Sequence, residues 1–292
     1  MRILLTGAQG QLGRSIQKMH PELLPGGDIV FTDLPELDIT DAAAVTRFVR
    51  DFQPDHILNC AAYTAVDQAE SDAENAFLVN ALAPKILAQA AHEMKAGMTH
   101  ISTDYVFDGQ HHRPYTEEHP TGPQGVYGKS KLEGEMAVRQ NHPRALIIRT
   151  SWLYSEFGHN FVKTMRRLGS EKESINVVAD QIGNPTWATD LASAILHILA
   201  GNRKDHASGI YHYTNEGIAS WYDLAVAVMS ISNLQCKVSP IRTEEYPVPA
   251  PRPFYSALDK TKIKRNFGLS IPHWRESLEQ CIRILSEQAA SE

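Results

Sequence analysis

The chain has few cysteines and no long apolar run. Its three cysteines, Cys60, Cys236 and Cys281, lie far apart, match no metal-ligand spacing and cannot all pair with one another. We therefore expect free thiols and a reducing compartment. No apolar stretch is long enough to cross a membrane, and glycine and glutamine follow the first apolar residues too soon for a secretory signal peptide. These absences predict a cytoplasmic protein that does not enter the membrane.

An excess of positive charge is missing as well. Lysine and arginine number 28 against 34 aspartates and glutamates, which gives a net charge of -6. Without a Lys/Arg run, this balance argues against a nucleic-acid partner. The 13 histidines, among them His111 and His112, lack the spacing of metal ligands, so no metal site is expected. What remains is a chain of 292 residues, 42% of them hydrophobic, which is enough for a full core.

Short apolar runs alternate with helical patterns in the first half of the chain. Strands are expected at residues 2–6, 28–33, 55–60, 98–102 and 145–150. Helical patterns fill the intervals at residues 12–19, 40–52 and 72–94, the last interrupted near Pro84. This alternation is typical of βαβ units, and it predicts an α/β fold with a doubly wound, parallel Rossmann-type sheet.

The pattern loosens after residue 150. Helices are expected near residues 160–168, 189–199 and 221–231, followed by a proline-rich stretch, and only a frayed end is expected from residue 288 onward. We therefore expect a dinucleotide-binding domain over residues 1–150. Residues 151–292 should form mainly a smaller α/β substrate lobe, with some segments returning to the first core.

Three glycines, Gly7, Gly10 and Gly13, are spaced three residues apart between the first strand and the first helix. Small residues permit a tight turn and let backbone N–H groups approach a pyrophosphate at the helix N-terminus. A purely structural turn would explain any one of them, but three in register favour dinucleotide binding, with Gln11 and Leu12 in the same turn. Ligands of open parallel sheets bind beyond the carboxyl ends of the strands. The residues expected to ring that crevice are Gly7, Asp33, Thr64, Thr103 and Ser151.

Two aspartates after the second expected strand are candidates for binding the adenosine half of a dinucleotide. Asp33 is placed to accept a hydrogen bond from a ribose hydroxyl, or it serves only the turn before Pro35. Asp38, followed by Ile39, either meets the adenine or begins the turn into the next helix. The charge of Asp33 disfavours the extra phosphate of NADP, whereas the nearby Arg14 offsets this effect. These residues are therefore compatible with either NADPH or NADH as the cofactor.

Tyr127 and Lys131 lie four residues apart and share one face of an expected helix. An ammonium beside the phenol would lower the pKa of Tyr127 and make it an acid usable near neutral pH. Thr103 follows a strand that faces the crevice, where its hydroxyl can hydrogen-bond a substrate carbonyl oxygen. Each feature alone is weak, because such Tyr/Lys pairs are usually exposed and loop threonines usually form turns.

The glycine turn, Thr103, Tyr127 and Lys131 together resemble the extended short-chain dehydrogenase/reductase family, in which the hydroxyl, tyrosine and lysine form the catalytic set. Within it, residues 102–109, 127–135, 149–154 and 180–186 are similar to the dTDP-4-dehydrorhamnose reductases, as are residues 250–253 in the later lobe. The resemblance implies reduction of the C4 ketone of dTDP-4-dehydro-L-rhamnose to dTDP-L-rhamnose by NADPH or NADH.

The resemblance also implies positions for both ligands. Beside the cofactor it places Ala62, Tyr63 and Thr64, and near the substrate Thr103, Asp104, Tyr105, Val66 and Trp152. An indole at position 152 can pack on a sugar or base, and its alternative is a core tryptophan. Gln181, Asn184 and Arg252 are candidates for base or diphosphate recognition, although Asn184 before Pro185 would also suit a turn.

Some family members dimerise through a metal held partly by an acidic residue just after the third glycine. This chain has Arg14 and Ser15 there, so we expect a monomer or weak homodimer without a bridging metal. One alternative is a regulatory β subunit of a methionine adenosyltransferase, which binds a dinucleotide without turnover; the complete catalytic set argues against it. The other is an epimerase or dehydratase of the same fold, and the single acidic residue after Thr103, Asp104, favours net reduction instead.

Overall fold

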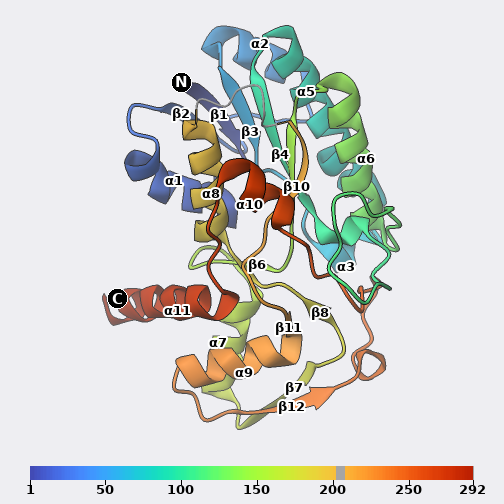
Figure 1. Ribbon diagram of the computed structural model, residues 1–292, viewed down its shortest axis with the longest axis vertical. Coiled ribbons are helices and arrows are strands. Elements are labelled where there is room, and N and C mark those ends of the chain that lie inside the picture. Colours follow the sequence, from blue (N-terminus) through green and yellow to red (C-terminus); the bar gives the residue numbers. More distant parts are fainter. Residues whose placement is uncertain (202–207, 292) are drawn as a thin grey trace.

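A six-stranded, all-parallel sheet forms the centre of the molecule in the computed structural model, which describes residues 1–201 and 208–291 (Figure 1). Its spatial order is β10-β5-β4-β3-β1-β2. The strands are β1 (Arg2–Thr6), β2 (Asp28–Thr32), β3 (His56–Asn59), β4 (Gly97–Thr103), β5 (Leu146–Thr150) and β10 (Gly209–His212). The order reverses between β1 and β3, as expected of a doubly wound sheet, so the predicted fold class is confirmed.

Helices cover both faces of this sheet because its strands are apolar on both sides. Along β1, Ile3 and Leu5 face one layer of helices and Leu4 faces the other. The first layer contains α1 (Gln11–Leu23), α8 (Ala188–Ala200) and α10 (Thr261–Phe267). The second contains α2 (Ala42–Phe52), α5 (Ala83–Glu93) and α6 (Val126–Asn141). Segments beyond residue 150 therefore complete this domain: β10 adds an edge strand to the sheet, and α8 and α10 belong to the first helical layer.

The helical pattern expected over residues 72–94 is divided into three parts. It consists of α4 (Ala73–Phe77), a π-helical turn η1 (Leu78–Leu82) and α5, in which Pro84 occupies the first turn. Proline has no N–H to donate, and it follows directly after a π-helical turn, in which the regular hydrogen bonds of the α-helix are already displaced. The short helix α3 (Val66–Ala69) precedes this segment.

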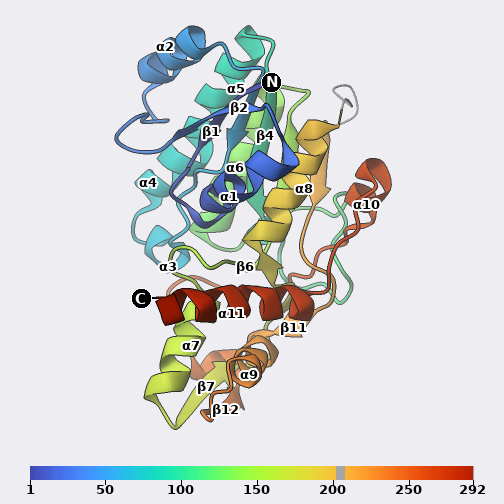
Figure 2. The same ribbon diagram turned by 90° about the vertical axis from the view of Figure 1, so that its left-hand side faces the viewer.

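A smaller lobe lies below the sheet in Figure 2 and has its own hydrophobic core. Its helices are α7 (Phe161–Glu171), α9 (Trp221–Ile231) and α11 (Trp274–Ser291). Its strand pairs are β6 (Leu153–Tyr154) with β9 (Thr186–Trp187), β7 (Ser174–Val178) with β12 (Lys237–Ile241), and β8 (Ile182–Gly183) with β11 (Ala219–Ser220). The turns η2 (Asp104–Val106) and η3 (Thr243–Glu245) are 3-10 helices.

The expectation of a frayed end from residue 288 onward was wrong for most of that stretch, because α11 continues to Ser291. Its residues Leu278, Ile282 and Leu285 are buried in the core of the smaller lobe. This apolar stripe has helical spacing and stabilises the helix against the lobe. Within the described residues, no helix is both long and apolar enough to cross a membrane.

Candidate active site

A cavity of about 990 Å³ opens at the carboxyl ends of the sheet strands and extends to the smaller lobe. Most of the residues proposed from the sequence line it. They are Gly7, Gly10, Gln11, Leu12, Asp33, Asp38, Ile39, Ala62, Thr64, Val66, Thr103, Asp104, Tyr105, Tyr127, Lys131, Ser151, Trp152 and Arg252. The sheet topology explains this convergence, because parallel strands bring all their carboxyl ends to one edge.

The three glycines of the turn between β1 and α1 meet different requirements. Gly7 has φ +75°, and a Cβ there would lie 2.5 Å from the backbone nitrogen of Ala61. Gly13 lies outside the cavity lining, and a Cβ on it would overlap the carbonyl oxygen of Gly7. Gly10 has only that oxygen nearby, at 3.3 Å from such a Cβ, and it lines the cavity. Gly7 and Gly13 thus permit close packing, whereas Gly10 leaves space for a ligand.

The N-terminus of α1 suits a pyrophosphate. Its N-cap residue is Gly10, so no side chain satisfies the first N–H groups of the helix. These donors and the positive end of the helix dipole lie at the cavity. The residues present therefore fit the phosphate groups of a dinucleotide.

Asp33 and Asp38 line the cavity and also organise the chain after β2. The Asp33 carboxylate accepts hydrogen bonds from the backbone N–H groups of Gln9, at 2.9 Å, and Leu34, at 3.0 Å. Asp38 accepts from the hydroxyl and the backbone N–H of Thr40, and these bonds lower the pKa of its carboxyl. Each aspartate can therefore stabilise its turn and also contact a ligand in the cavity. That Asp33 and Asp38 bind the adenosine half of a dinucleotide stays a prediction.

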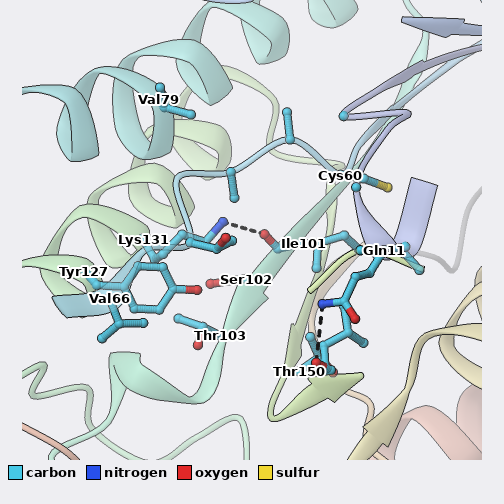
Figure 3. Close-up of a pocket in the computed structure, with 18 of the residues that line it drawn as sticks. Gln11, Cys60, Val66, Val79, Ile101, Ser102, Thr103, Tyr127, Lys131 and Thr150 are labelled. Atoms are coloured by element: carbon cyan, nitrogen blue, oxygen red, sulfur yellow. Dashed lines mark hydrogen bonds between the residues drawn. The ribbon is translucent and has the colours of Figure 1, made fainter. Parts of the chain in front are cut away.

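Tyr127 and Lys131 lie on α6 beside the end of β4. Figure 3 shows the Tyr127 hydroxyl pointing toward Ser102 and Thr103. The Lys131 ammonium donates to the carbonyl oxygen of Ile101 at 2.7 Å. Both side chains are almost completely buried, and together with Thr103 they place a hydroxyl, a phenol and an amine on one wall of the cavity.

The Tyr127 pKa is raised, whereas the sequence led us to expect a lowered value beside Lys131. Burial raises the pKa of Tyr127 to about 12, although a hydrogen bond with Thr103 acts in the opposite direction. Burial also lowers the pKa of Lys131 to about 8, against the effect of Glu135. The physical reason is that both groups leave water, which disfavours each charged form, while the ammonium is directed to a backbone carbonyl.

Further polar groups line the cavity. Burial raises the pKa of Asp104 to about 6, although bonds with Ser256 and Thr103 lower it. The Ser102 and Thr150 hydroxyls are buried and have no hydrogen-bond partner in the described part of the chain. Buried polar groups normally have partners, so these two hydroxyls are available to a ligand. Like Thr103 and Ser151, they lie at the carboxyl ends of β4 and β5, but the sequence analysis did not propose them as ligand-binding residues.

An aromatic wall closes the side of the cavity that faces the smaller lobe. Trp152 has a φ of 48° and stacks on Trp221, with ring centroids 3.6 Å apart and planes within 7°. Phe161 lies 4.6 Å from the Trp221 ring, and all three residues line the cavity. Trp221 was missed from sequence because it begins a helix after the capping residue Ser220, and nothing local indicates its partner 69 positions earlier.

Arg252 reaches the cavity from the proline-rich stretch and pairs with Asp67 at 2.7 Å. Three other proposed residues do not line the cavity. Gln181 donates to Thr243, and Tyr63 donates from its hydroxyl to Asp72. Asn184 is fully buried, accepts from the Leu258 N–H and donates to the Gly217 carbonyl.

Arg14 and Ser15, which follow the third glycine where a bridging acid would be needed, make other contacts here. The Arg14 guanidinium lies 4.5 Å from the centre of the Phe157 ring, and the Ser15 hydroxyl donates to the Gln11 carbonyl. Within residues 1–201 and 208–291, no three His, Cys, Asp or Glu side chains are grouped so that they could hold a metal. Cys60, Cys236 and Cys281 are free thiols.

Residues 1–287 match the family described as the RmlD substrate binding domain. The dTDP-4-dehydrorhamnose reductase of Aggregatibacter actinomycetemcomitans is 42% identical over 98% of this chain and 99% of that protein. A crystal structure of such a reductase from Clostridium acetobutylicum has a TM-score of 0.94 at 44% identity, covering 98% of this chain and 100% of that one.

A second solved relative is the dTDP-4-dehydrorhamnose reductase of Bacillus anthracis in complex with NADP. It has a TM-score of 0.91 at 42% identity and covers 97% of this chain and 99% of its own. These likenesses extend over nearly the whole chain, and they confirm the resemblance that the sequence motifs indicated. The chain therefore belongs to the RmlD family, the family of the dTDP-4-dehydrorhamnose reductases.

Proposed function

We propose that this protein reduces the C4 ketone of dTDP-4-dehydro-L-rhamnose to dTDP-L-rhamnose with NADPH or NADH. The observation that carries the proposal is the position of Tyr127, Lys131 and Thr103 on one wall of a cavity that begins at the glycine turn. Membership of the family and the NADP complex of the Bacillus anthracis relative support it. We expect the reaction to take place in the cytoplasm.

The nicotinamide supplies the hydride that C4 of the sugar accepts. Tyr127 transfers its phenolic proton to the C4 oxygen, so that the carbonyl becomes an alcohol, and the resulting tyrosinate regains a proton from solvent. A pKa of about 12 keeps Tyr127 protonated at neutral pH until negative charge develops on that oxygen. The Thr103 hydroxyl, which donates to the Asp104 carboxylate at 3.0 Å, would turn its proton toward the same oxygen, and the positive charge of Lys131 favours the tyrosinate that forms.

For the substrate we propose the aromatic wall and Arg252. The stacked indoles of Trp152 and Trp221 provide a flat apolar surface for a sugar or base. Arg252 has a buried guanidinium nitrogen without a hydrogen-bond partner in the described residues, next to the cavity, which suits a diphosphate oxygen. Gln181 and Asn184 are not retained, because both side chains are engaged away from the cavity.

The reaction can be tested by following the loss of nicotinamide absorbance. Purified protein is mixed with NADPH, and separately with NADH, while dTDP-4-dehydro-L-rhamnose is generated in situ. Consumption matched by dTDP-L-rhamnose would support the proposal and determine the cofactor preference. Dinucleotide binding without consumption would instead favour the regulatory-subunit interpretation, and interconversion of sugars without net consumption would favour an epimerase. The proposed monomer or weak homodimer is open to sedimentation analysis of the same sample.

A further inference from the structure

The side chain of Gln11 joins the two lobes at the edge of the cavity. Gln11 is the first residue of α1, directly after the glycine turn. Its amide oxygen accepts hydrogen bonds from the Ser155 hydroxyl and the Asn160 amide, each at 3.1 Å. Its amide nitrogen lies 3.5 Å from the Leu153 carbonyl oxygen. These partners follow Gln11 by 142 to 149 positions, and all of them belong to the segment that begins the smaller lobe.

The segment at residues 155–160, which we call the interlobe loop, is folded around this amide. Asn160 also donates to the Ser155 carbonyl at 2.8 Å, and its side-chain oxygen accepts from the Lys163 N–H as the N-cap of α7. The Ser155 hydroxyl accepts a hydrogen bond from the Phe157 N–H at 3.0 Å, and its single proton is shared between the Gln11 amide oxygen at 3.1 Å and the Phe157 carbonyl oxygen at 2.9 Å. The Gln11 oxygen therefore binds both side chains that define the loop's shape.

The interlobe loop leads directly to the aromatic wall. Phe161 follows Asn160, opens α7 and lies against Trp221, which stacks on Trp152. Gln11, Asn160 and Phe161 all line the cavity. A continuous series of contacts thus runs from the turn that faces the dinucleotide phosphates to the surface proposed for the sugar nucleotide.

We infer that Gln11 is a positioning residue that couples the two binding sites: a dinucleotide held at the glycine turn fixes Gln11, and Gln11 fixes the interlobe loop and the aromatic wall behind it. The inference rests on the proposed function for the identity of the second ligand. A bound dinucleotide then strengthens nucleotide-sugar binding, and by thermodynamic reciprocity the sugar nucleotide strengthens dinucleotide binding by the same factor. Side-chain contacts of a few hydrogen bonds are sufficient to bias a loop in this way.

The test compares the wild type with Gln11→Met, which keeps the length and helix propensity of the side chain and removes its amide. Titration calorimetry measures the dissociation constant of dTDP without NADP⁺ and with saturating NADP⁺. In the wild type we expect dTDP to bind about fivefold to tenfold more tightly with NADP⁺, which is a typical coupling between sites. In Gln11→Met this ratio should fall to about one. Equal ratios in both proteins would overturn the inference.

Lys18→Met provides the matched control. Lys18 also lies on α1 and bonds Glu156 of the same loop at 2.7 Å, but it does not line the cavity. We expect it to keep the wild-type ratio, which separates coupling through Gln11 from general loosening between the lobes. Loss of the ratio in Lys18→Met as well would assign the effect to the contacts between α1 and the interlobe loop in general and contradict a specific role for Gln11.

Hydrogen exchange gives a second measurement that does not depend on the sugar nucleotide. NADP⁺ alone should slow exchange of the amides at residues 157–162 in the wild type and in Lys18→Met, but not in Gln11→Met. Unchanged exchange in the wild type at saturating NADP⁺ would refute the coupling. If dTDP fails to bind any of the three proteins, the proposed substrate is wrong, and the exchange result still decides the role of Gln11.

Discussion

The proposed cofactor end of the cavity is assembled from residues close together in the sequence, whereas its proposed substrate end is assembled from segments far apart. At the cofactor end, Gly7, Gly10 and Gln11 lie within one turn, and Asp33 follows the next strand. At the substrate end, Trp152, Trp221 and Arg252 come from different parts of the smaller lobe. The first arrangement depends on backbone geometry near one strand, and the second depends on how a whole lobe packs.

The two ends also differ in what holds them in place. Gly7 and Gly13 allow backbone atoms to approach closely, so the cofactor end tolerates no side chain there. The substrate end is held by side chains, namely a stacked pair of indoles and the ion pair between Arg252 and Asp67. We therefore expect the largest loss of activity from substitutions at Tyr127, which lies between the two ends, a smaller loss of dinucleotide affinity from substitutions at the first end, and the smallest loss of substrate affinity from substitutions at the second.

The largest effect is expected at Tyr127, the proposed proton donor, which lies between the two ends of the cavity. Tyr127→Phe removes the proton donor and leaves the ring, so kcat should fall about 100-fold to 10,000-fold. Dinucleotide binding, measured by fluorescence titration, should stay within about twofold because the glycine turn is untouched. Full activity in this variant would show that another group donates the proton.

The next largest effect is expected at the cofactor end. A valine side chain at position 10 would occupy the space that the glycine turn leaves above the N-terminus of α1. Dinucleotide affinity of Gly10→Val should fall roughly tenfold to 100-fold, equivalent to about 1 to 3 kcal/mol of overpacking. Gly13→Ala is the matched control, because its Cβ meets the Gly7 carbonyl oxygen rather than the cavity.

Gly13→Ala should lower the melting temperature, by about 2 to 4 °C for each kcal/mol of strain. The same substitution should change dinucleotide affinity less than Gly10→Val does, once the protein is compared at a temperature where both variants are folded. The opposite order of affinities would contradict the assignment of Gly10 to ligand space and Gly13 to helix packing.

The contrast between local and distant contacts also explains which parts of the fold and site the sequence could predict. The strands β1 to β5 were predicted within about two residues, because their apolar runs and turns are local signals. The glycine turn, Thr103, Tyr127 and Lys131 were found for the same reason. The strands β7 and β12 were not predicted, since they pair over a separation of more than sixty positions, Ser174 with Lys237.

The substrate-side candidates were harder to place for the same reason. Gln181 and Asn184 lie in one of the motifs that resemble the family, but their side chains bond Thr243 and the Leu258 N–H, and neither residue lines the cavity. Trp221 lines the cavity without any local motif, because its partner Trp152 lies in another segment. Similarly, a lysine near a tyrosine predicted a lowered tyrosine pKa, whereas burial, which the sequence does not reveal, acts in the opposite direction.

A moderate effect is expected at the substrate end. Trp221→Leu keeps an apolar side chain but removes the ring that stacks on Trp152. The KM for the nucleotide sugar should rise about threefold to tenfold, since an aromatic pair contributes about 0.5 to 1.5 kcal/mol beyond its buried area. The KM for NADPH should change little. An equal rise in both values would show that the two ends are not separable at this residue.

The smallest effect is expected from a change of pH, which alters the charge of Lys131 beside Tyr127. The Lys131 pKa is lowered to about 8, so its ammonium is present below that pH and is lost above it. Its charge stabilises the tyrosinate, and kcat should therefore be level from pH 6.5 to 7.5 and fall a few-fold by pH 9. Lys131→Arg, which stays charged across this range, should have lower activity but no such decline. A decline that persists in Lys131→Arg would assign it to another group.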